Sequence, residues 1–193
     1  MREIELPDWR IAKGCRSQRL TFHFLNRKGF YVDLTNRQRS ITLRFLAEPS
    51  DVNFGGKVHG GTVMKWIDQA GYTCAVGWSW QYCVTIYVGG IRFFQPILIG
   101  DLVEVQAKLI YTGTTSMHIA VDVWAGDPKV TERRKTTHCI IIFVAVDGAG
   151  KPTQIPAWQS QTEEDRRLEA YAQQLMVLRK GIEEEMSRFQ ETH

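Results

Sequence analysis

The feature that most constrains this chain is one helical segment followed directly by four long strand-like segments. Residues 62–78 place apolar side chains at steps of three or four, the period of a helix that buries one face. Segments rich in Val, Ile, Thr and aromatic residues then alternate with Gly, Pro and Asp turn signals: 83–94, 101–113, 115–126 and 137–147. Before the helix, 41–46 alternates like a half-buried strand. The short links favour an antiparallel meander, and one helix on a curved antiparallel sheet is the simplest α+β fold.

The flanking parts of the chain have different patterns. Residues 1–40 are polar and basic, and only the short alternation at 20–25 predicts a strand there. The sequence therefore divides into a basic extension (1–40) whose order it leaves open, a central domain (41–158) and a C-terminal helix (159–193).

The C-terminal helix begins at a capping-box pattern, Thr162 to Asp165, with acidic residues in its first turn. Apolar residues then form a heptad-like seam: Leu168, Tyr171, Leu175, Leu178, Ile182 and Phe189. Gly181 and a seam position at Glu185 argue against a long coiled coil. Two interpretations stay open: the helix lies on its own domain, or it packs between subunits.

Composition and charge exclude several classes of protein. The longest apolar run, 139–146, has 8 residues, far short of the ~20 that a membrane helix needs. Of the 24 Lys and Arg residues, 9 lie in residues 1–40, and the rest of the chain is close to neutral. A nucleic-acid-binding domain would carry its basic surface on the folded part, so we expect neither nucleic acid nor a membrane as partner.

The four cysteines, Cys15, Cys74, Cys83 and Cys139, are far apart and form no metal-ligand pattern with histidine. Free thiols in a reducing cytoplasm explain them better than a disulfide framework does. Residues 1–14 also lack the apolar stretch of a secretory signal. We therefore expect a cytoplasmic protein without a metal site or a resident cofactor.

The segment most suggestive of chemistry runs from Asn53 through His59, Gly60 and Gly61 to Asp68. Two glycines at a helix start let a ligand approach the backbone, and the free N–H groups there suit an oxyanion. Asp68 lies seven residues past Gly61, on the same side of the helix but ~10.5 Å further along its axis.

This spacing separates the two groups within one chain, because an aspartate side chain is too short to reach a carbonyl at the helix start. If both groups serve one reaction, Asp68 must come from a second helix that runs antiparallel alongside. A two-fold dimer supplies that helix, so the predicted site is shared between subunits.

The chain resembles the acyl-CoA thioesterases of the hotdog-fold superfamily across residues 41–158. The resemblance is carried, in order, by Asn53-x-x-Gly56-x-x-His59-Gly60-Gly61 with Asp68, Val84-Thr85, residues 91–96, Gly100-Asp101, residues 112–117 and residues 143–147. It implies a central helix wrapped by a five- or six-stranded antiparallel sheet. It also implies an acyl-CoA substrate and a homodimer, or a tetramer or hexamer built from dimers.

The resemblance implies a role for each matching residue. Asp68 would be the general base or the nucleophile, Asn53 would position water or substrate from the opposite subunit, and Gly61 would donate its N–H to the oxyanion. Thr85 would lie near the reaction centre. Gly60 and His59 would contact substrate at the helix start, and the coenzyme A nucleotide would pass along Gly113, Thr114, Thr115 and Ser116.

One departure from the family pattern concerns phosphate binding. Thr114 stands where many relatives carry Arg, and Lys57, Arg133 or Arg134 are candidates to replace that contact. A plainer structural role is favoured for His59 as a helix-start residue and for Cys74 as core, while Met64 and Trp66 fit either an acyl tunnel or the core.

The prediction is thus a thioesterase that hydrolyses acyl-CoA to a free acid and coenzyme A. Two alternatives stay open: a non-catalytic acyl-CoA sensor, and a hotdog dehydratase acting on acyl carrier protein through His59 and Asp68.

Overall fold

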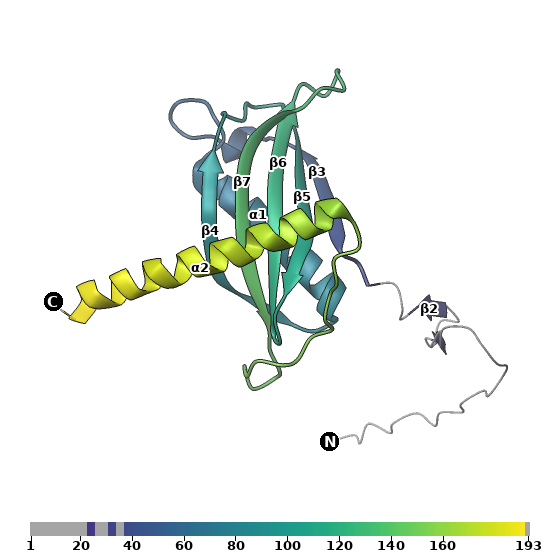
Figure 1. Ribbon diagram of the computed structural model, residues 1–193. Coiled ribbons are helices and arrows are strands. Elements are labelled where there is room, and N and C mark those ends of the chain that lie inside the picture. The colour runs from purple at the N-terminus through teal and green to yellow at the C-terminus, as the bar shows by residue number, and fades with distance from the viewer. Residues whose placement is uncertain (1–22, 26–30, 34–36, 192–193) are drawn as a thin grey trace, which may run out of the picture. The chain divides into compact units, whose positions relative to one another are not determined.

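The computed structural model describes residues 23–25, 31–33 and 37–191 (Figure 1). The chain divides into two units, residues 1–36 and 37–193. In the first, β1 (His23–Leu25) pairs antiparallel with β2 (Tyr31–Asp33). The strand predicted at 20–25 is therefore present at 23–25, while residues 20–22 and Cys15 lie outside the described residues.

The second unit contains a five-stranded antiparallel sheet in the order β3-β5-β6-β7-β4. Its strands are β3 (Ser40–Leu46), β4 (Cys83–Phe93), β5 (Leu102–Thr112), β6 (Ser116–Gly126) and β7 (Arg134–Ala145). The predicted meander is correct for β5, β6 and β7 and wrong for β4, which pairs with β7 instead of β5. The helix between β3 and β4 carries the chain across the sheet, so these two strands form its opposite edges (Figure 1).

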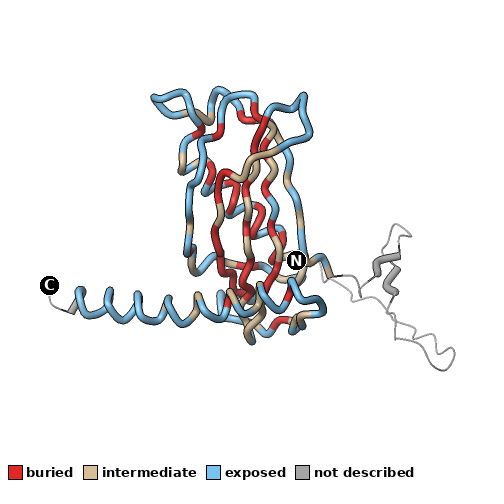
Figure 2. The backbone as a smooth tube through the Cα atoms, turned by 45° about the horizontal axis from the view of Figure 1, so that its top comes forward, coloured by how far each residue is buried: buried red, intermediate tan, exposed pale blue. Residues whose placement is uncertain are grey.

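Helix α1 (Gly60–Ser79) covers the inner face of the sheet and supplies one side of the core. Its buried residues follow the predicted period, and the strands contribute inward side chains such as Val105, Ile119 and Ile141. The buried residues are concentrated on the central helix and the middle strands of the sheet (Figure 2). The helix approaches β7 closely: a Cβ added at Gly71 would lie 2.8 Å from the ring of Phe143. This is the one-helix α+β fold that the sequence predicts.

Helix α2 (Glu163–Glu191) begins with the predicted capping box. The Asp165 N–H donates to Thr162 Oγ1 (3.1 Å), and the Thr162 N–H donates to Asp165 Oδ2 (3.3 Å). Asp165 is buried and also pairs with Arg39 at 2.5 Å. The hydrogen bond from Arg39 is the main reason why the pKa of this carboxyl lies well below its usual range. The helix start is thereby fixed to the sheet.

The first half of α2 crosses the outer face of the sheet, where Leu168, Tyr171 and Leu175 pack on Ile110 and Ile140. This half therefore lies on its own domain. The second half extends past the β4 edge into solvent (Figure 1). No helix of the described residues is long and apolar enough to span a membrane.

Candidate active site

Asp68 lies on the face of α1 that points away from the core. The burial period of the helix leaves Met64, Asp68 and Tyr72 exposed along one line. Thr85, near the start of β4, faces this line, and its Oγ1 donates a hydrogen bond to Asp68 Oδ1 at 2.6 Å. The structure therefore brings two of the predicted catalytic residues together on the exposed side of the fold.

The start of α1 is capped by His59, whose Nδ1 accepts a hydrogen bond from the Gly61 N–H at 3.1 Å. The Gly61 N–H, the predicted oxyanion donor, is therefore engaged by a side chain in this structure. Among the hydrogen bonds of residues 37–191, none uses the N–H of Gly60. The helix start thus offers the Gly60 N–H, while His59 caps the Gly61 N–H.

Asn53 belongs to the loop before α1, and its Oδ1 accepts hydrogen bonds from the N–H groups of Gly55 (2.9 Å) and Lys57 (3.4 Å). A cavity of about 360 Å³ lies between this loop, the helix start and the chain after β4. It is lined by Asn53, Lys57, Val58, Gly60, Val63, Phe93, Phe94, Gln95, Pro96, Ile97 and Thr137. Asn53 and Gly60 thus share a cavity that does not include Asp68.

Phe93 and Phe94 are cavity residues that the sequence analysis did not assign to the site. Both are about half exposed, at 50% and 46%. The signal available in the sequence was an aromatic pair at the end of a strand, followed closely by Pro96. Exposed aromatic side chains at such a position indicate a ligand-binding or interaction surface.

Residues 113–116 form the turn between β5 and β6. The Gly113 N–H donates to the Ser116 carbonyl at 2.8 Å, and the carbonyls of Thr114 and Thr115 accept from Ile155 and Ala145. Ala145 pairs with Cys83, whereas Thr137, in the cavity, pairs with Phe93. The turn therefore lies at the opposite end of the sheet from the Asn53 cavity.

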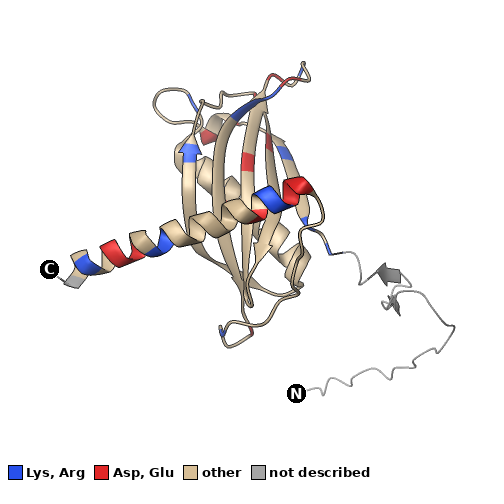
Figure 3. Cartoon of the chain, viewed as in Figure 1, with Lys and Arg blue, Asp and Glu red and all other residues tan. Residues whose placement is uncertain are grey.

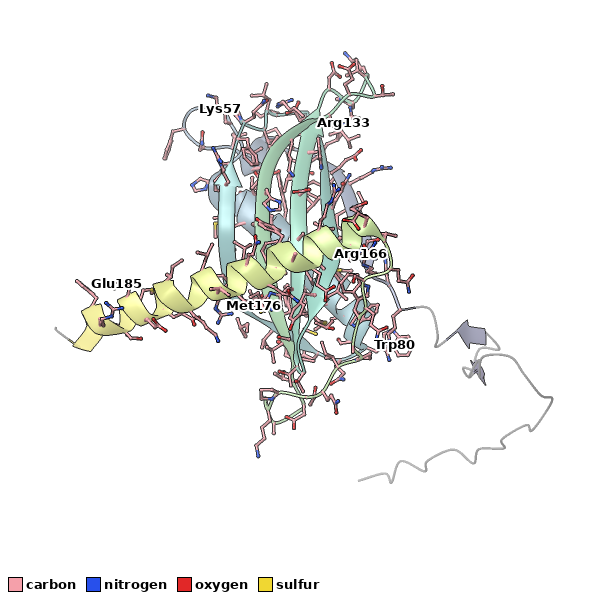
Figure 4. All side chains as sticks on the ribbon, in the orientation of Figure 1. Lys57, Trp80, Arg133, Arg166, Met176 and Glu185 are labelled. Atoms are coloured by element: carbon pink, nitrogen blue, oxygen red, sulfur yellow. The ribbon has the colours of Figure 1, made fainter. Side chains whose placement is uncertain are left out.

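The three candidate phosphate ligands differ in their existing partners. Arg134 pairs with Asp101 at 2.6 Å, and Arg133 donates to carbonyls of its own loop. Lys57 is exposed, lines the cavity and makes none of the ion pairs of the described residues. Lys57 and Arg133 lie at one end of the fold, and Trp80 lies at the other (Figure 4). Of the three, Lys57 is the group available to a ligand.

Other candidate groups have structural roles. Cys74 and Cys139 are fully buried, and burial raises the pKa of each thiol to about 12, so neither is a nucleophile. Trp66 is buried with its ring edge-to-face on Phe45, at a centroid distance of 4.7 Å, so it belongs to the core. No cluster of metal-ligating side chains occurs within the described part of the chain.

The sequence of this chain is similar to those of known proteins. The family model described as the thioesterase superfamily matches residues 55–132. The chain is 33% identical over 145 residues to protein VdlD of Helicobacter pylori, covering 75% of this chain and 82% of that protein. It is 37% identical over 123 residues to the acyl-CoA thioester hydrolase YciA of Escherichia coli, covering 62% and 92%.

Two solved structures extend the comparison to the fold. An apo-hexameric acyl-CoA thioesterase matches with a TM-score of 0.71 and 31% identity, covering 75% of this chain and 92% of that one. The acyl-CoA hydrolase of Staphylococcus aureus, solved with butyryl coenzyme A and coenzyme A, matches with a TM-score of 0.74 and 25% identity, covering 80% and 94%.

Proposed function

The chain belongs to the thioesterase superfamily, and from this premise we propose that it hydrolyses acyl-CoA thioesters with Asp68 as the catalytic carboxylate. The observation that carries the proposal is the Thr85–Asp68 hydrogen bond, which holds an exposed carboxylate in a defined orientation at the sheet edge. An orienting partner of this kind is what a general base or nucleophile requires.

The proposed site is shared between two subunits. Within one chain, Asp68 and Thr85 are separate from the cavity of Asn53 and Gly60, because Thr85 lies near the start of β4 and Phe93 at its end. If the β4 strands of two copies pair antiparallel, the start of one lies beside the end of the other. That pairing would bring Asp68 to the partner's cavity and produce two equivalent sites.

The edge of β4 supports this pairing. It is 11 residues long, and Ile86 (46% exposed) and Val88 (39% exposed) present apolar side chains on it. Long apolar edge strands are normally covered, because their free N–H and C=O groups attract another strand. A dimer, or a larger assembly built from dimers, is therefore part of the proposal.

The chemistry needs a nucleophile, an oxyanion donor and a proton for the leaving thiolate. In the general-base route, Asp68 takes a proton from water, the water oxygen bonds to the acyl carbon, and the C–S bond breaks as the proton passes to sulfur. In the nucleophilic route, an Asp68 carboxylate oxygen bonds to the acyl carbon while the C–S bond breaks and coenzyme A leaves as its thiolate; water then hydrolyses the acyl anhydride, which restores Asp68, and a proton from that water passes to the thiolate. In both routes the Gly60 N–H stabilises the oxyanion, joined by the Gly61 N–H when the His59 ring releases it, and Asn53 and the 113–116 turn contact the substrate.

The proposal is tested by coenzyme A release from a chain-length panel of acyl-CoAs. We expect Asp68→Asn to lower kcat by about 100-fold or more, the cost of losing a general base. Glu163→Gln, which removes an exposed carboxylate at the start of α2 on the outer side of the sheet, is the matched control and should leave kcat unchanged. Micromolar acyl-CoA binding without turnover in the wild type would instead indicate a sensor.

The shared site is tested by mixing two inactive variants, Asn53→Ala and Asp68→Asn, under conditions that exchange subunits. A mixed dimer contains one site with both residues intact, so activity should return on mixing. If a verified mixed dimer of the two variants stays inactive, the site lies within one subunit.

A further inference from the structure

The second half of α2 carries an apolar stripe that its own domain does not cover. Leu178, Ile182 and Met186 are 62%, 53% and 58% exposed. At 100° per residue, these three lie within about 80° of the side on which Leu168, Tyr171 and Leu175 pack against the sheet. The surface that binds α2 to its own sheet therefore continues, in line, beyond the sheet edge.

The helix crosses that edge at a defined place. The guanidinium of Arg179 lies over the ring of Tyr87 in β4, 4.5 Å from its centroid. Leu178 and Ile182 line a cavity of about 160 Å³ with Tyr87, Gly89 and Gly90. Ile182 is three residues, or ~4.5 Å, past Arg179. With ~4.8 Å between strands, Ile182 lies near the line along which a second β4 would pair.

From these observations we infer that residues 178–186 of α2 form an arm that packs on the outer face of a second copy of this chain, joined at β4. Pairing at β4 continues the sheet beneath the projecting half-helix, so the stripe meets a new sheet surface instead of water. The inference rests in part on the shared site proposed above, because one two-fold axis would serve both. It adds an interface on the opposite face of the sheet from Asp68.

The two-fold axis gives the arm a definite neighbour. The 11 residues from Gly181 to the end of α2 extend ~16 Å, enough to cross the partner's β4 and β7. The partner's own α2 runs antiparallel beside it, since an isologous interface repeats each contact. The stripe would thus pack in the angle between the partner's sheet and the partner's α2. Charged residues of both signs line the rest of the helix and remain in solvent (Figure 3).

The free energy of helix formation also favours a covering partner. Most helical stability in proteins comes from packing of an apolar face, and a glycine such as Gly181 in a helix interior weakens the helix relative to Ala. Nothing lies within 4 Å of a Cβ added at Gly181, so packing within the chain does not explain the glycine. Packing against a second copy would supply the missing stabilisation.

Photo-cross-linking tests the arm in the full-length protein. p-Benzoylphenylalanine at position 186 reports the stripe, and the same group at position 177, which is 71% exposed on the opposite side of α2, is the matched control. In a mixture of ¹⁴N and ¹⁵N protein, we expect mixed-isotope cross-links from position 186 to peptides of the partner's β4, β7 or α2, and none from position 177. The inference would be overturned if position 186 gave no cross-links, cross-links within one chain only, or cross-links to other elements of the partner.

A second measurement uses dissociation of the dimer. Ile182→Glu places two like charges near the two-fold axis, and we expect it to raise the dimer dissociation constant about tenfold or more, whereas Val177→Glu should leave it unchanged. Equal constants for both variants would refute the arm. Coenzyme A release by the same preparations separates the two proposals. An active enzyme without cross-links would refute only the proposed arm. A wild type that cross-links but is inactive would refute only the proposed hydrolase activity.

Discussion

Thr85 Oγ1 donates a 2.6 Å hydrogen bond to Asp68 Oδ1, which links the edge strand β4 to the exposed side of α1. Among the hydrogen bonds of residues 37–191, none uses the second carboxylate oxygen of Asp68, and the bond from Thr85 limits rotation of the carboxylate. Thr85 is therefore a positioning residue in the proposed reaction. Its contribution depends on the side-chain hydroxyl. A substitution that keeps the shape of the side chain but removes the hydroxyl therefore distinguishes the orientation of Asp68 from the packing of residue 85.

Thr85→Val keeps the side-chain shape and removes the hydroxyl. A hydrogen bond to a charged group contributes about 1.5–3 kcal/mol, so we expect kcat to fall roughly 10- to 100-fold while KM changes little. Thr85→Ser, which restores the hydroxyl, should recover most of the activity in the coenzyme A release assay. A rise in KM with kcat unchanged would instead assign Thr85 to substrate binding.

Within the described part of the chain, the Lys57 ammonium makes no hydrogen bond or ion pair, unlike the guanidinium groups of Arg133 and Arg134, and Lys57 lines the cavity near Asn53. Lys57→Ala should raise KM for acyl-CoA by a few-fold to about tenfold, the range for one exposed charge contact, with kcat nearly unchanged. A short thioester that lacks the nucleotide phosphates should show no change in KM. Arg44→Ala, at an exposed position on β3, is the control for net charge.

His118 is buried on the outer side of the sheet, with its ring edge-to-face on Tyr111 at 5.2 Å. Burial, helped by the charge of Arg179, lowers the pKa of this imidazole to about 4 from 6.5. The unfolded chain therefore binds a proton that the folded chain does not bind between pH 6.5 and 4.

The stability that depends on neutral His118 is complete above about pH 6.5 and is lost as the pH falls toward 4. We expect this to cost the wild type on the order of 2 kcal/mol of unfolding free energy over that range. His118→Phe should show a flatter dependence in urea unfolding, and at pH 8 the two proteins should differ only by packing. Equal slopes for both would mean that His118 titrates freely in the folded protein.

Gly71 is required where α1 approaches β7, because a Cβ there would lie 2.8 Å from Phe143 and 2.9 Å from Ile141. Gly71→Ala should lower the unfolding free energy by about 1–3 kcal/mol, the cost of overpacking a core. Gly148→Ala is the matched control, since nothing lies within 4 Å of a Cβ at that position. Unchanged stability of Gly71→Ala would show that the helix moves away at little cost.

The sequence predicted the elements well where a local period was strong. The helix at 62–78 and the strand segments up to 147 correspond to α1 and β4 to β7 within a few residues, since buried faces repeat along each element. The capping box at Thr162 was also predictable, because all its groups lie within four residues. The pairing of β4 was not, because local patterns do not encode which edge of the sheet a strand joins.

At the site, the sequence determined that Asp68 and the helix start face the same side of one helix and lie ~10.5 Å apart along its axis, because helix geometry fixes both. Only the tertiary structure decided that Thr85 is the hydrogen-bond partner of Asp68, that His59 engages the Gly61 N–H, and that Phe93 and Phe94 join Asn53 in one cavity. Each of these contacts joins separate elements or depends on a side-chain rotamer. The free energy that selects them comes from the packing of α1 against the whole sheet, which no segment of the sequence contains by itself.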